Sequence, residues 1–223
     1  MKIAVSGATG RMGKLIIEAV LCSDDLELAA AVTAPGVPEI GTDAGAAIGK
    51  TTGILISDDV QEIAKADVLI DFTRPQATLT YLPFCVAHNV GVVIGTTGFD
   101  AQGKEKIAAA AKSVPVVFAP NMSVGVNSVL KLLEIAGAML SQYDCEIVEM
   151  HHKHKVDAPS GTALEMGRRV AQGRGVDFDS VAVLSREGHT GERPDGAIGF
   201  AALRGGDVVG DHTVIFAGPG ERI

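Results

Sequence analysis

Residues 146–163, EIVEMHHKHKVDAPSGTA, combine side chains that can exchange protons with a turn that can bind an anion. His151 and His152 carry imidazoles, which titrate near neutral pH. The Pro-Ser-Gly-Thr turn at 159–162 should open a helix, because Ser160 is a good N-cap. Gly161 and Thr162 would then offer N–H groups and a hydroxyl to a carboxylate. The segment predicts a general acid beside an anion-binding helix start.

Further cations surround these imidazoles. Lys153, His154 and Lys155 follow directly, and positive charges this close together should lower the histidine pKa values. If the segment is a strand, alternation places His152 and His154 on one face and His151 on the other. We predict that His152 and Lys155 could hold a second anionic group.

The segment has three other possible roles. A metal site lacks a cysteine, or a carboxylate at ligand spacing, to complete its ligands, so no metal is predicted. Nucleophilic catalysis by Ser160 lacks an obvious acidic partner to orient a base. A solvated basic loop without a function stays open as the third interpretation.

Near the N-terminus, three glycines at 7, 10 and 13 lie between a short apolar run and an amphipathic pattern. This spacing is a variant of the dinucleotide fingerprint, in which glycines permit the tight turn, the approach of a pyrophosphate and close helix–strand packing. A purely structural turn is the alternative. The pattern predicts that NADH or NADPH is bound by Gly7, Ala8, Thr9, Gly10, Arg11 and Met12.

The remaining cofactor residues are predicted from strand ends. Dinucleotide folds tend to carry an acid about 20 residues after the glycine turn. Here the second strand ends near Thr33 without an acid or an arginine, so the choice between NADH and NADPH stays open. Two later loops also follow strands, where ligands of parallel sheets bind. The first of these loops contains Gly95, Thr96 and Thr97. The second contains Ala119, Pro120, Asn121 and Met122, and an amide in this second loop could bind the nicotinamide carboxamide.

Composition narrows the class of protein. The 223 residues are 47% apolar, enough for one large or two modest cores, and the net charge of −8 argues against nucleic-acid binding. The uncharged span 75–99 is too rich in polar residues and glycine for a membrane helix. Cys22, Cys85 and Cys145 form no pair by spacing, which predicts buried thiols in a reducing compartment. We therefore expect a cytoplasmic protein without a membrane or nucleic-acid partner.

Periodicity predicts an α/β protein with two domains, divided between residues 121 and 122. Up to about residue 120, short apolar runs alternate with helical patterns, which is typical of a Rossmann-type doubly wound parallel sheet. Strands are expected there at 2–6, 26–32, 67–71, 91–94 and 115–119, with helices at 11–22, 58–66, 75–88 and 100–112. A second α+β domain on a mixed sheet should follow, with helices at 123–142 and 160–172 and strands at 144–150, 180–184, 197–204 and 208–216.

Motifs along nearly the whole chain resemble the 4-hydroxy-tetrahydrodipicolinate reductase (dihydrodipicolinate reductase) family. They are GATGRMG at 7–13, DFTRP at 71–75, GTTGF at 95–99, NMSVGVN at 121–127, HHKHKVDAPSGTA at 151–163, SREGHTGER at 185–193 and GDHTVIFAGPGER at 210–222. The resemblance implies an NAD(P)H-dependent oxidoreductase of diaminopimelate and lysine biosynthesis. It would reduce 4-hydroxy-tetrahydrodipicolinate, a small cyclic dicarboxylate, to tetrahydrodipicolinate.

The resemblance also implies roles for particular residues. His151 would donate the proton, and Lys155 would assist it or bind substrate. The substrate carboxylates would be held by His152, Gly161 and Thr162. Arg74 would lie near the adenosine half of the cofactor. Residues 1–121 would bind the dinucleotide, and residues 122–223 would bind substrate and build a homotetramer through their sheet.

Two departures from the family pattern leave alternatives open. Many members carry an acid and a base where Thr33 and Ala34 stand, and the family usually continues past Arg222. A non-catalytic NAD(P)-binding paralogue or sensor that lacks the C-terminal tail is therefore the alternative function. A dehydrogenase acting on a semialdehyde is another, but it would need a catalytic thiol, and Cys145 lies in no reactive context.

Overall fold

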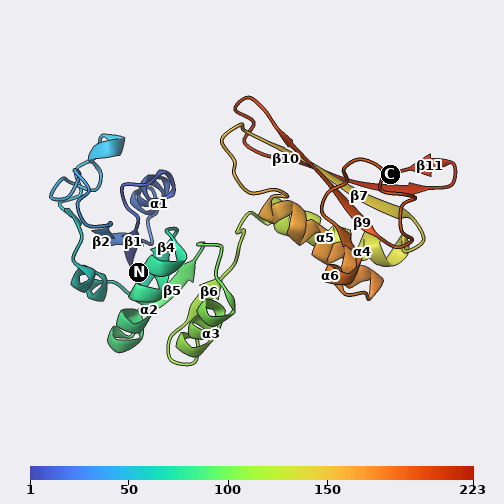
Figure 1. The fold of residues 1–223 in the computed structure, drawn as a ribbon. Helices are drawn as coiled ribbons and strands as arrows, with labels where there is room; N and C mark the ends of the chain where they lie inside the picture. Colours follow the sequence, from blue (N-terminus) through green and yellow to red (C-terminus); the bar gives the residue numbers. More distant parts are fainter. The chain divides into compact units, whose positions relative to one another are not determined.

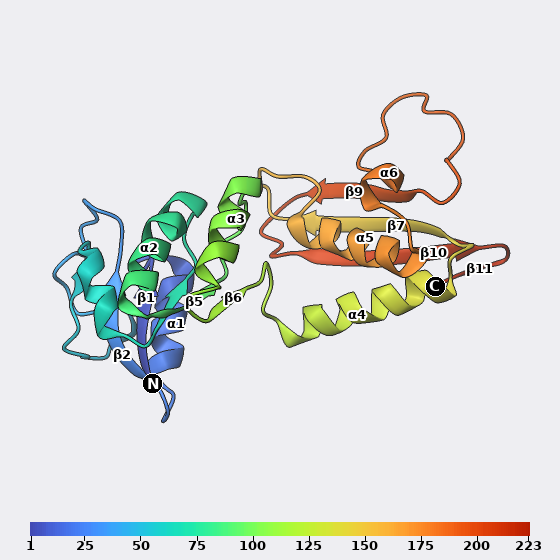
Figure 2. The same ribbon diagram turned by 90° about the horizontal axis from the view of Figure 1, so that it is seen from below.

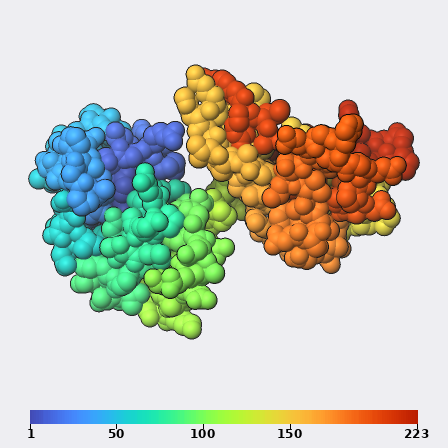
Figure 3. Space-filling model, in the orientation of Figure 1, coloured from blue at the N-terminus to red at the C-terminus, as the bar shows by residue number.

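A computed structural model describes residues 1–223 and divides them into two compact units, Met1–Pro120 and Asn121–Ile223. The first unit runs from blue to green in Figure 1 and in the space-filling view of Figure 3, and the second from green-yellow to red. Each unit has its own sheet and its own apolar core. No helix of either unit has the length and apolar character needed to span a membrane.

The first unit is built on a six-stranded, wholly parallel sheet in the order β3-β2-β1-β4-β5-β6. This is the strand order of dinucleotide-binding folds, and the predicted doubly wound sheet is confirmed. Its strands are β1 (Lys2–Ser6), β2 (Glu27–Val32), β3 (Ile56–Ser57), β4 (Val68–Asp71), β5 (Gly91–Ile94) and β6 (Val116–Phe118). Its helices are α1 (Arg11–Leu21), α2 (Pro75–His88) and α3 (Ala101–Ala110), with 3-10 turns η1 (Ala46–Ile48) and η2 (Val60–Lys65).

Local chemistry explains the bounds of these helices. Helix α2 begins with Pro75, whose fixed φ suits a first helical position, and ends at Asn89, which has a φ of 56°. Helix α3 is capped by Asp100, whose carboxylate accepts a hydrogen bond from the N–H of Gly103 at 2.7 Å. The helix predicted at 58–66 is instead the 3-10 turn η2.

The second unit pairs two long helices with a five-stranded mixed sheet in the order β11-β10-β7-β9-β8. Strands β7, β9 and β8 run parallel, whereas β10 is antiparallel to both β7 and β11, so the predicted mixed sheet is confirmed. The elements are α4 (Val124–Met139), β7 (Asp144–His151), α5 (Gly161–Arg174), α6 (Phe178–Val181), β8 (Ala182–Val183), β9 (Ile198–Arg204), β10 (Asp211–Gly218) and β11 (Glu221–Arg222).

Side chains alternate along β7 between a covered and an open face of this sheet. Cys145 and Ile147 point to the covered face, where Leu133 of α4 and Val170 of α5 complete the core. Helices α4 and α5 lie on this one side of the sheet (Figure 2). Because Glu149 and His151 continue the same alternation, the fold carries two polar side chains into the covered side.

The stretch 184–197, between β8 and β9, contains no helix or strand and is attached to the open face of the sheet by two arginines. Arg186 donates to both carboxylate oxygens of Glu146 at 2.7 and 2.8 Å, and Arg193 donates to the same carboxylate at 3.0 Å. Gly199 on β9 leaves the necessary space, since a Cβ there would lie 2.1 Å from Glu146 Oε2. One carboxylate therefore anchors both halves of the stretch.

The cysteines only partly match the prediction. Cys85 and Cys145 are buried as expected, but Cys22 is exposed, because it follows the end of α1. Burial raises the pKa of Cys85 to about 12 and that of Cys145 to about 11. A thiol held protonated in this way is a poor nucleophile, which argues against the catalytic thiol that a semialdehyde dehydrogenase would need.

Candidate active site

The glycine turn of the first unit connects β1 to α1 with little space for side chains. Gly7 has a φ of +64°, and a Cβ on Gly13 would lie 2.1 Å from the carbonyl oxygen of Gly7. No side chain caps α1, and its first turn holds no acidic residue. The first N–H groups of a helix lack intrahelical acceptors and favour anions. The predicted residues Gly7, Ala8, Thr9, Gly10, Arg11 and Met12 thus form a turn that fits a pyrophosphate.

Thr33, at the end of β2, is buried beside this turn. Its hydroxyl lies 3.0 Å from that of Thr9, so a hydrogen bond joins the glycine turn to the residue that follows β2. Asp43 is not available for a ribose, since it accepts hydrogen bonds from the backbone of Gly45, Thr52 and Gly53. The bond from Gly45 is the main reason that the pKa of Asp43 lies at about 2.

Asp71, the last residue of β4, is a fully buried carboxylate surrounded by hydroxyl groups. Ser6 donates to it at 2.6 Å, Thr73 at 2.6 Å and Thr96 at 3.1 Å, and Thr78 of α2 donates a fourth bond. These donors come from the ends of β1, β4 and β5 and from α2. Asp71 therefore fixes the loops at the carboxyl edge of the sheet, where dinucleotides bind.

The other predicted cofactor residues lie in those loops. Gly95 is required by its neighbour Phe72, because a Cβ at Gly95 would overlap the phenyl ring. Thr96 is buried and also accepts the N–H of Thr73 at 2.8 Å. Thr97 is exposed, and Arg74 precedes the first turn of α2.

The last predicted cofactor segment crosses the division between the units. Ala119 and Pro120 follow β6, whereas Asn121 and Met122 begin the second unit. Asn121 already accepts the N–H of Ser123 through its side-chain oxygen at 2.8 Å. The amide nitrogen of Asn121 can donate a hydrogen bond to a carboxamide oxygen.

The Asp71 cluster allows a direct test. We expect Asp71→Asn to lower the free energy of unfolding by about 2 kcal/mol or more, because the amide NH₂ cannot accept hydroxyl protons in a buried site. Cofactor affinity should fall with it. Urea unfolding and cofactor titration measure both effects. The matched control is Asp100→Asn, since Asn caps helices as well as Asp does; equal loss of stability in the two variants would contradict the assignment.

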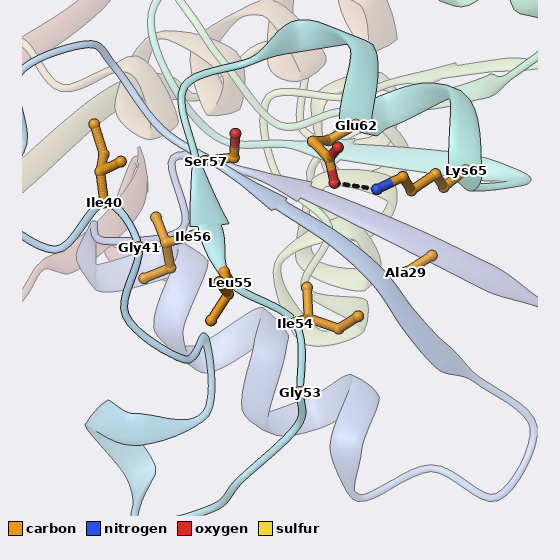
Figure 4. Close-up of a pocket in the computed structure, with 10 residues that line it drawn as sticks. All are labelled: Ala29, Ile40, Gly41, Gly53, Ile54, Leu55, Ile56, Ser57, Glu62 and Lys65. Atoms are coloured by element: carbon orange, nitrogen blue, oxygen red, sulfur yellow. Dashed lines mark hydrogen bonds and ion pairs between the residues drawn. The ribbon is translucent and has the colours of Figure 1, made fainter.

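A hollow of the first unit lies away from these loops. It is formed by the edge strand β3, by parts of the loop between β2 and β3 and by Ala29 of β2, and the ion pair between Lys65 and Glu62 also lines it (Figure 4). Its walls are mainly apolar side chains such as Ile40, Ile54 and Ile56. None of the predicted cofactor residues lines it, but Ser57 in its wall accepts the N–H of Thr33 at 2.9 Å.

In the second unit, His151 ends β7 and is held by a buried carboxylate. Its Nδ1 lies 2.6 Å from Oε2 of Glu149, which is 1% exposed. Arg204 of β9 donates to both oxygens of Glu149 at 2.8 and 2.9 Å. Burial alone would raise the pKa of Glu149, but the hydrogen bonds from Arg204 and His151 outweigh it and hold that pKa below its ordinary value.

The same carboxylate reaches the start of α5. Oε1 of Glu149 accepts the N–H of Ser160 at 3.1 Å, and the Ser160 hydroxyl caps the helix by accepting from Ala163 at 3.2 Å. The predicted N-cap is thus confirmed. Gly161 has open space where a Cβ would stand, and Thr162 is half-buried in the first turn, which holds no acid. This helix start fits a carboxylate ligand.

His212 of β10 completes the cluster on the covered face. Its Nε2 lies 2.9 Å from the Ser160 hydroxyl, and its ring meets that of His151 edge to face at 5.1 Å. Burial first, and then the nearby His151, hold the pKa of His212 below its ordinary value. Both effects favour the neutral form of His212.

The strand alternation predicted for the histidines holds only up to His151. Strand β7 ends there, so His152 and His154 lie in the following loop, with ring centroids 6.2 Å apart. Lys155 lies in the same loop and forms an ion pair with Asp157 at 2.7 Å. The predicted pair of substrate-binding residues, His152 and Lys155, is thus carried by a loop and not by the sheet.

Comparison with known proteins decides the family. The model of the N-terminal part of dihydrodipicolinate reductase matches residues 1–122, and the model of its C-terminal part matches residues 125–223. The chain belongs to the dihydrodipicolinate reductase family. The resemblance inferred from the motifs is confirmed.

Curated relatives within the family are closely similar. The 4-hydroxy-tetrahydrodipicolinate reductase of Cupriavidus metallidurans is 60% identical, and the match covers all of this chain and 85% of that protein. The protein of the same name from Polynucleobacter necessarius is 58% identical, with the same coverage.

Solved structures show the same fold. A dihydrodipicolinate reductase from Paenisporosarcina sp. TG-14, solved with dipicolinate, gives a TM-score of 0.74 at 24% identity and covers all of this chain and 85% of that one. GenD2 of gentamicin A biosynthesis, solved with NAD, gives 0.62 at 15% identity and covers all of this chain and 71% of that one. At 24% and 15% identity, these two similarities show that the chain shares the architecture of both proteins.

Four residues of these two clusters were not predicted from the sequence. Glu149 lies two positions before His151 and so shares its face of the strand. Strand alternation could therefore have indicated Glu149 from the sequence. Asp71 is an acid directly after an apolar run, which also marks it. Arg204 and His212 lie opposite β7 on its two neighbouring strands, and only the register of the sheet reveals them.

Proposed function

We propose that the chain catalyses the NAD(P)H-dependent reduction of 4-hydroxy-tetrahydrodipicolinate to tetrahydrodipicolinate. The substrate gains a hydride and a proton and loses one water. The observation that carries the proposal lies in the second unit: a single buried carboxylate, Glu149, binds both the imidazole of His151 and the helix start at Ser160. A proton donor and a carboxylate site are therefore neighbours. The names of the close relatives support the same reaction.

The first unit has the features needed for the cofactor. When bound, a reduced nicotinamide supplies the hydride. The uncapped start of α1 would hold the pyrophosphate, and the loops fixed by Asp71 would line the remainder of the site. We keep both NADH and NADPH as cofactors, because neither an acid nor an arginine follows β2 at Thr33.

The second unit supplies the acid and the substrate contacts in this proposal. His151 gives its proton from Nε2, while His152, Gly161 and Thr162 bind the substrate carboxylates. Lys155 assists His151 or binds substrate. In support, the helix start at Gly161 is free of acidic side chains, and the pair of Lys155 with Asp157 lies on the loop that joins β7 to it.

An absorbance assay at the nicotinamide band tests the reaction. Freshly generated substrate is mixed with the protein and either NADH or NADPH, and loss of the reduced band is expected with at least one of them. Binding of NAD(P)H without its oxidation would instead favour the alternative, a non-catalytic NAD(P)-binding paralogue or sensor.

We also propose a homotetramer built through the open face of the second sheet. That face carries Val148, Ala201, Leu203, Thr213 and Ile215, and Leu203 is 50% exposed. An apolar sheet face of this kind is typical of subunit interfaces. Light scattering after gel filtration measures the mass, and a monomer would contradict the assembly. A cytoplasmic location is supported by three cysteines that form no disulfide.

A further inference from the structure

Glu149 is a buried carboxylate, and both of its oxygens make hydrogen bonds within the candidate site. Oε2 contacts Nδ1 of His151 and Oε1 accepts the N–H of Ser160, while Arg204 donates to both. We propose that Glu149 is the positioning residue of His151, fixing the proton on Nδ1 so that Nε2 is the nitrogen that exchanges a proton with substrate. The inference rests on the proposed role of His151.

The two nitrogens of His151 have different surroundings. Nδ1 lies 2.6 Å from Glu149 Oε2, and this is the hydrogen bond that the His151 ring makes with the protein. Gly210, just before β10, leaves space there, since a Cβ on it would lie 2.7 Å from Nε2. The nitrogen held by a carboxylate keeps its proton, and the free nitrogen changes protonation.

Arg204 makes this arrangement stable in a buried place. An unpaired carboxylate that is 1% exposed would take up a proton or draw one from its neighbour. The bidentate contact from Arg204 balances the charge of Glu149 in both protonation states of His151. Glu149 therefore stays a carboxylate while His151 changes between imidazolium and neutral imidazole.

Glu149 also sets the position of the imidazole relative to the helix start. Its second oxygen binds the backbone of Ser160, so the proton donor and the carboxylate-binding turn are tied to one side chain. Ser160 keeps two further contacts that do not involve Glu149, from Ala163 and to His212. Loss of Glu149 should therefore disturb the orientation of His151 more than the binding of substrate.

The kinetic test is Glu149→Gln. We expect kcat to fall by about 10–100-fold, the usual effect of losing the partner that orients a functional histidine, with KM changed by less than about threefold. The limb of the pH–rate profile that reports the imidazolium should move to lower pH, because its negative partner is lost. The other charged or titratable groups beside His151, Arg204 of β9 and His212 of β10, are unchanged in the variant, as are Asp211 and Lys155, which act on His212.

Glu146→Gln is the matched control. Glu146 lies on the same strand and is also paired with arginine, but it points to the open face. We expect that variant to lose stability without moving the pH limb. An unshifted limb in Glu149→Gln, with kcat like that of the control, would overturn the positioning role.

A measurement on the unmodified protein covers the case in which Glu149→Gln does not fold. In ¹⁵N-labelled protein, long-range ¹⁵N–¹H spectra over a pH series identify the titrating nitrogen of each histidine, and the spectrum of His151→Gln assigns the signals. We expect Nδ1 of His151 to stay protonated while Nε2 titrates. Titration at Nδ1 refutes the inference even if His151 is essential. Full activity of His151→Gln would instead refute the proposed role of His151 itself.

Discussion

We expect His151→Gln to lower kcat by about 10²–10⁴-fold, the range typical for loss of a general acid. Glutamine fills similar space and can reach the carboxylate of Glu149, but it has no proton to give at neutral pH. Cofactor affinity should change little, because His151 lies in the second unit and the glycine turn in the first. Steady-state assays with NADH and NADPH measure the first effect, and fluorescence titration of the reduced cofactor measures the second.

His154→Gln is the matched control for this variant. His154 lies in the exposed loop after β7, and no carboxylate holds its ring. Its replacement should leave kcat within about twofold of the starting enzyme, as is usual for surface changes. Normal turnover in His151→Gln, or an equal loss in both variants, would exclude the assigned role of His151.

The second large effect is expected from Gly13→Ala. A Cβ at this position would lie 2.1 Å from the oxygen of Gly7 and 2.8 Å from Cα of Ala8, so the turn or α1 must move. Forced overpacking of this kind costs about 1–3 kcal/mol, more than the gain of about 1 kcal/mol that alanine brings to a helix. The displaced turn should weaken dinucleotide binding at least tenfold, an estimate that corresponds to about 1.4 kcal/mol.

Thermal unfolding and cofactor titration check this prediction. The matched control is Gly125→Ala in α4, where the nearest atom to the new Cβ, Ser123 Oγ, is at an ordinary 3.7 Å. That variant should be as stable as the starting protein or more so. If Gly13→Ala binds the dinucleotide with unchanged affinity, the turn between β1 and α1 does not form the pyrophosphate site.

Sequence patterns predicted the long elements because their signals are local. Helix α2 was expected at 75–88 and is observed there, since Pro75 favours its start and Asn89 its end. The two-residue strands β3 and β11 are too short to show a period. Strand β3 forms by pairing with the earlier strand β2, and β11 by pairing with β10 across the turn that joins them. Helical periodicity also does not distinguish a 3-10 turn from an α-helix, which explains the error at 60–65.

The parts of the candidate site whose signals are local in the sequence were also predictable. Ser160 and the helix start after it are visible in consecutive residues, and so are the paired histidines. The position of His152 was not, because strand alternation orders side chains only within a strand, and β7 ends at His151. Arg204 and His212 join the site from strands about 50 residues downstream, and their register depends on packing of the entire sheet.

The attachment of residues 184–197 to Glu146 has a consequence for how family sequences can diverge. The two arginines need an acid at 146, and that acid needs a residue without Cβ at 199. A larger residue at 199, or a neutral one at 146, leaves Arg186 without its counter-ion and Arg193 with Asp144 alone, at 2.7 Å. We expect positions 146, 186, 193 and 199 to be inherited as a set, so that homologues differ at all four or at none.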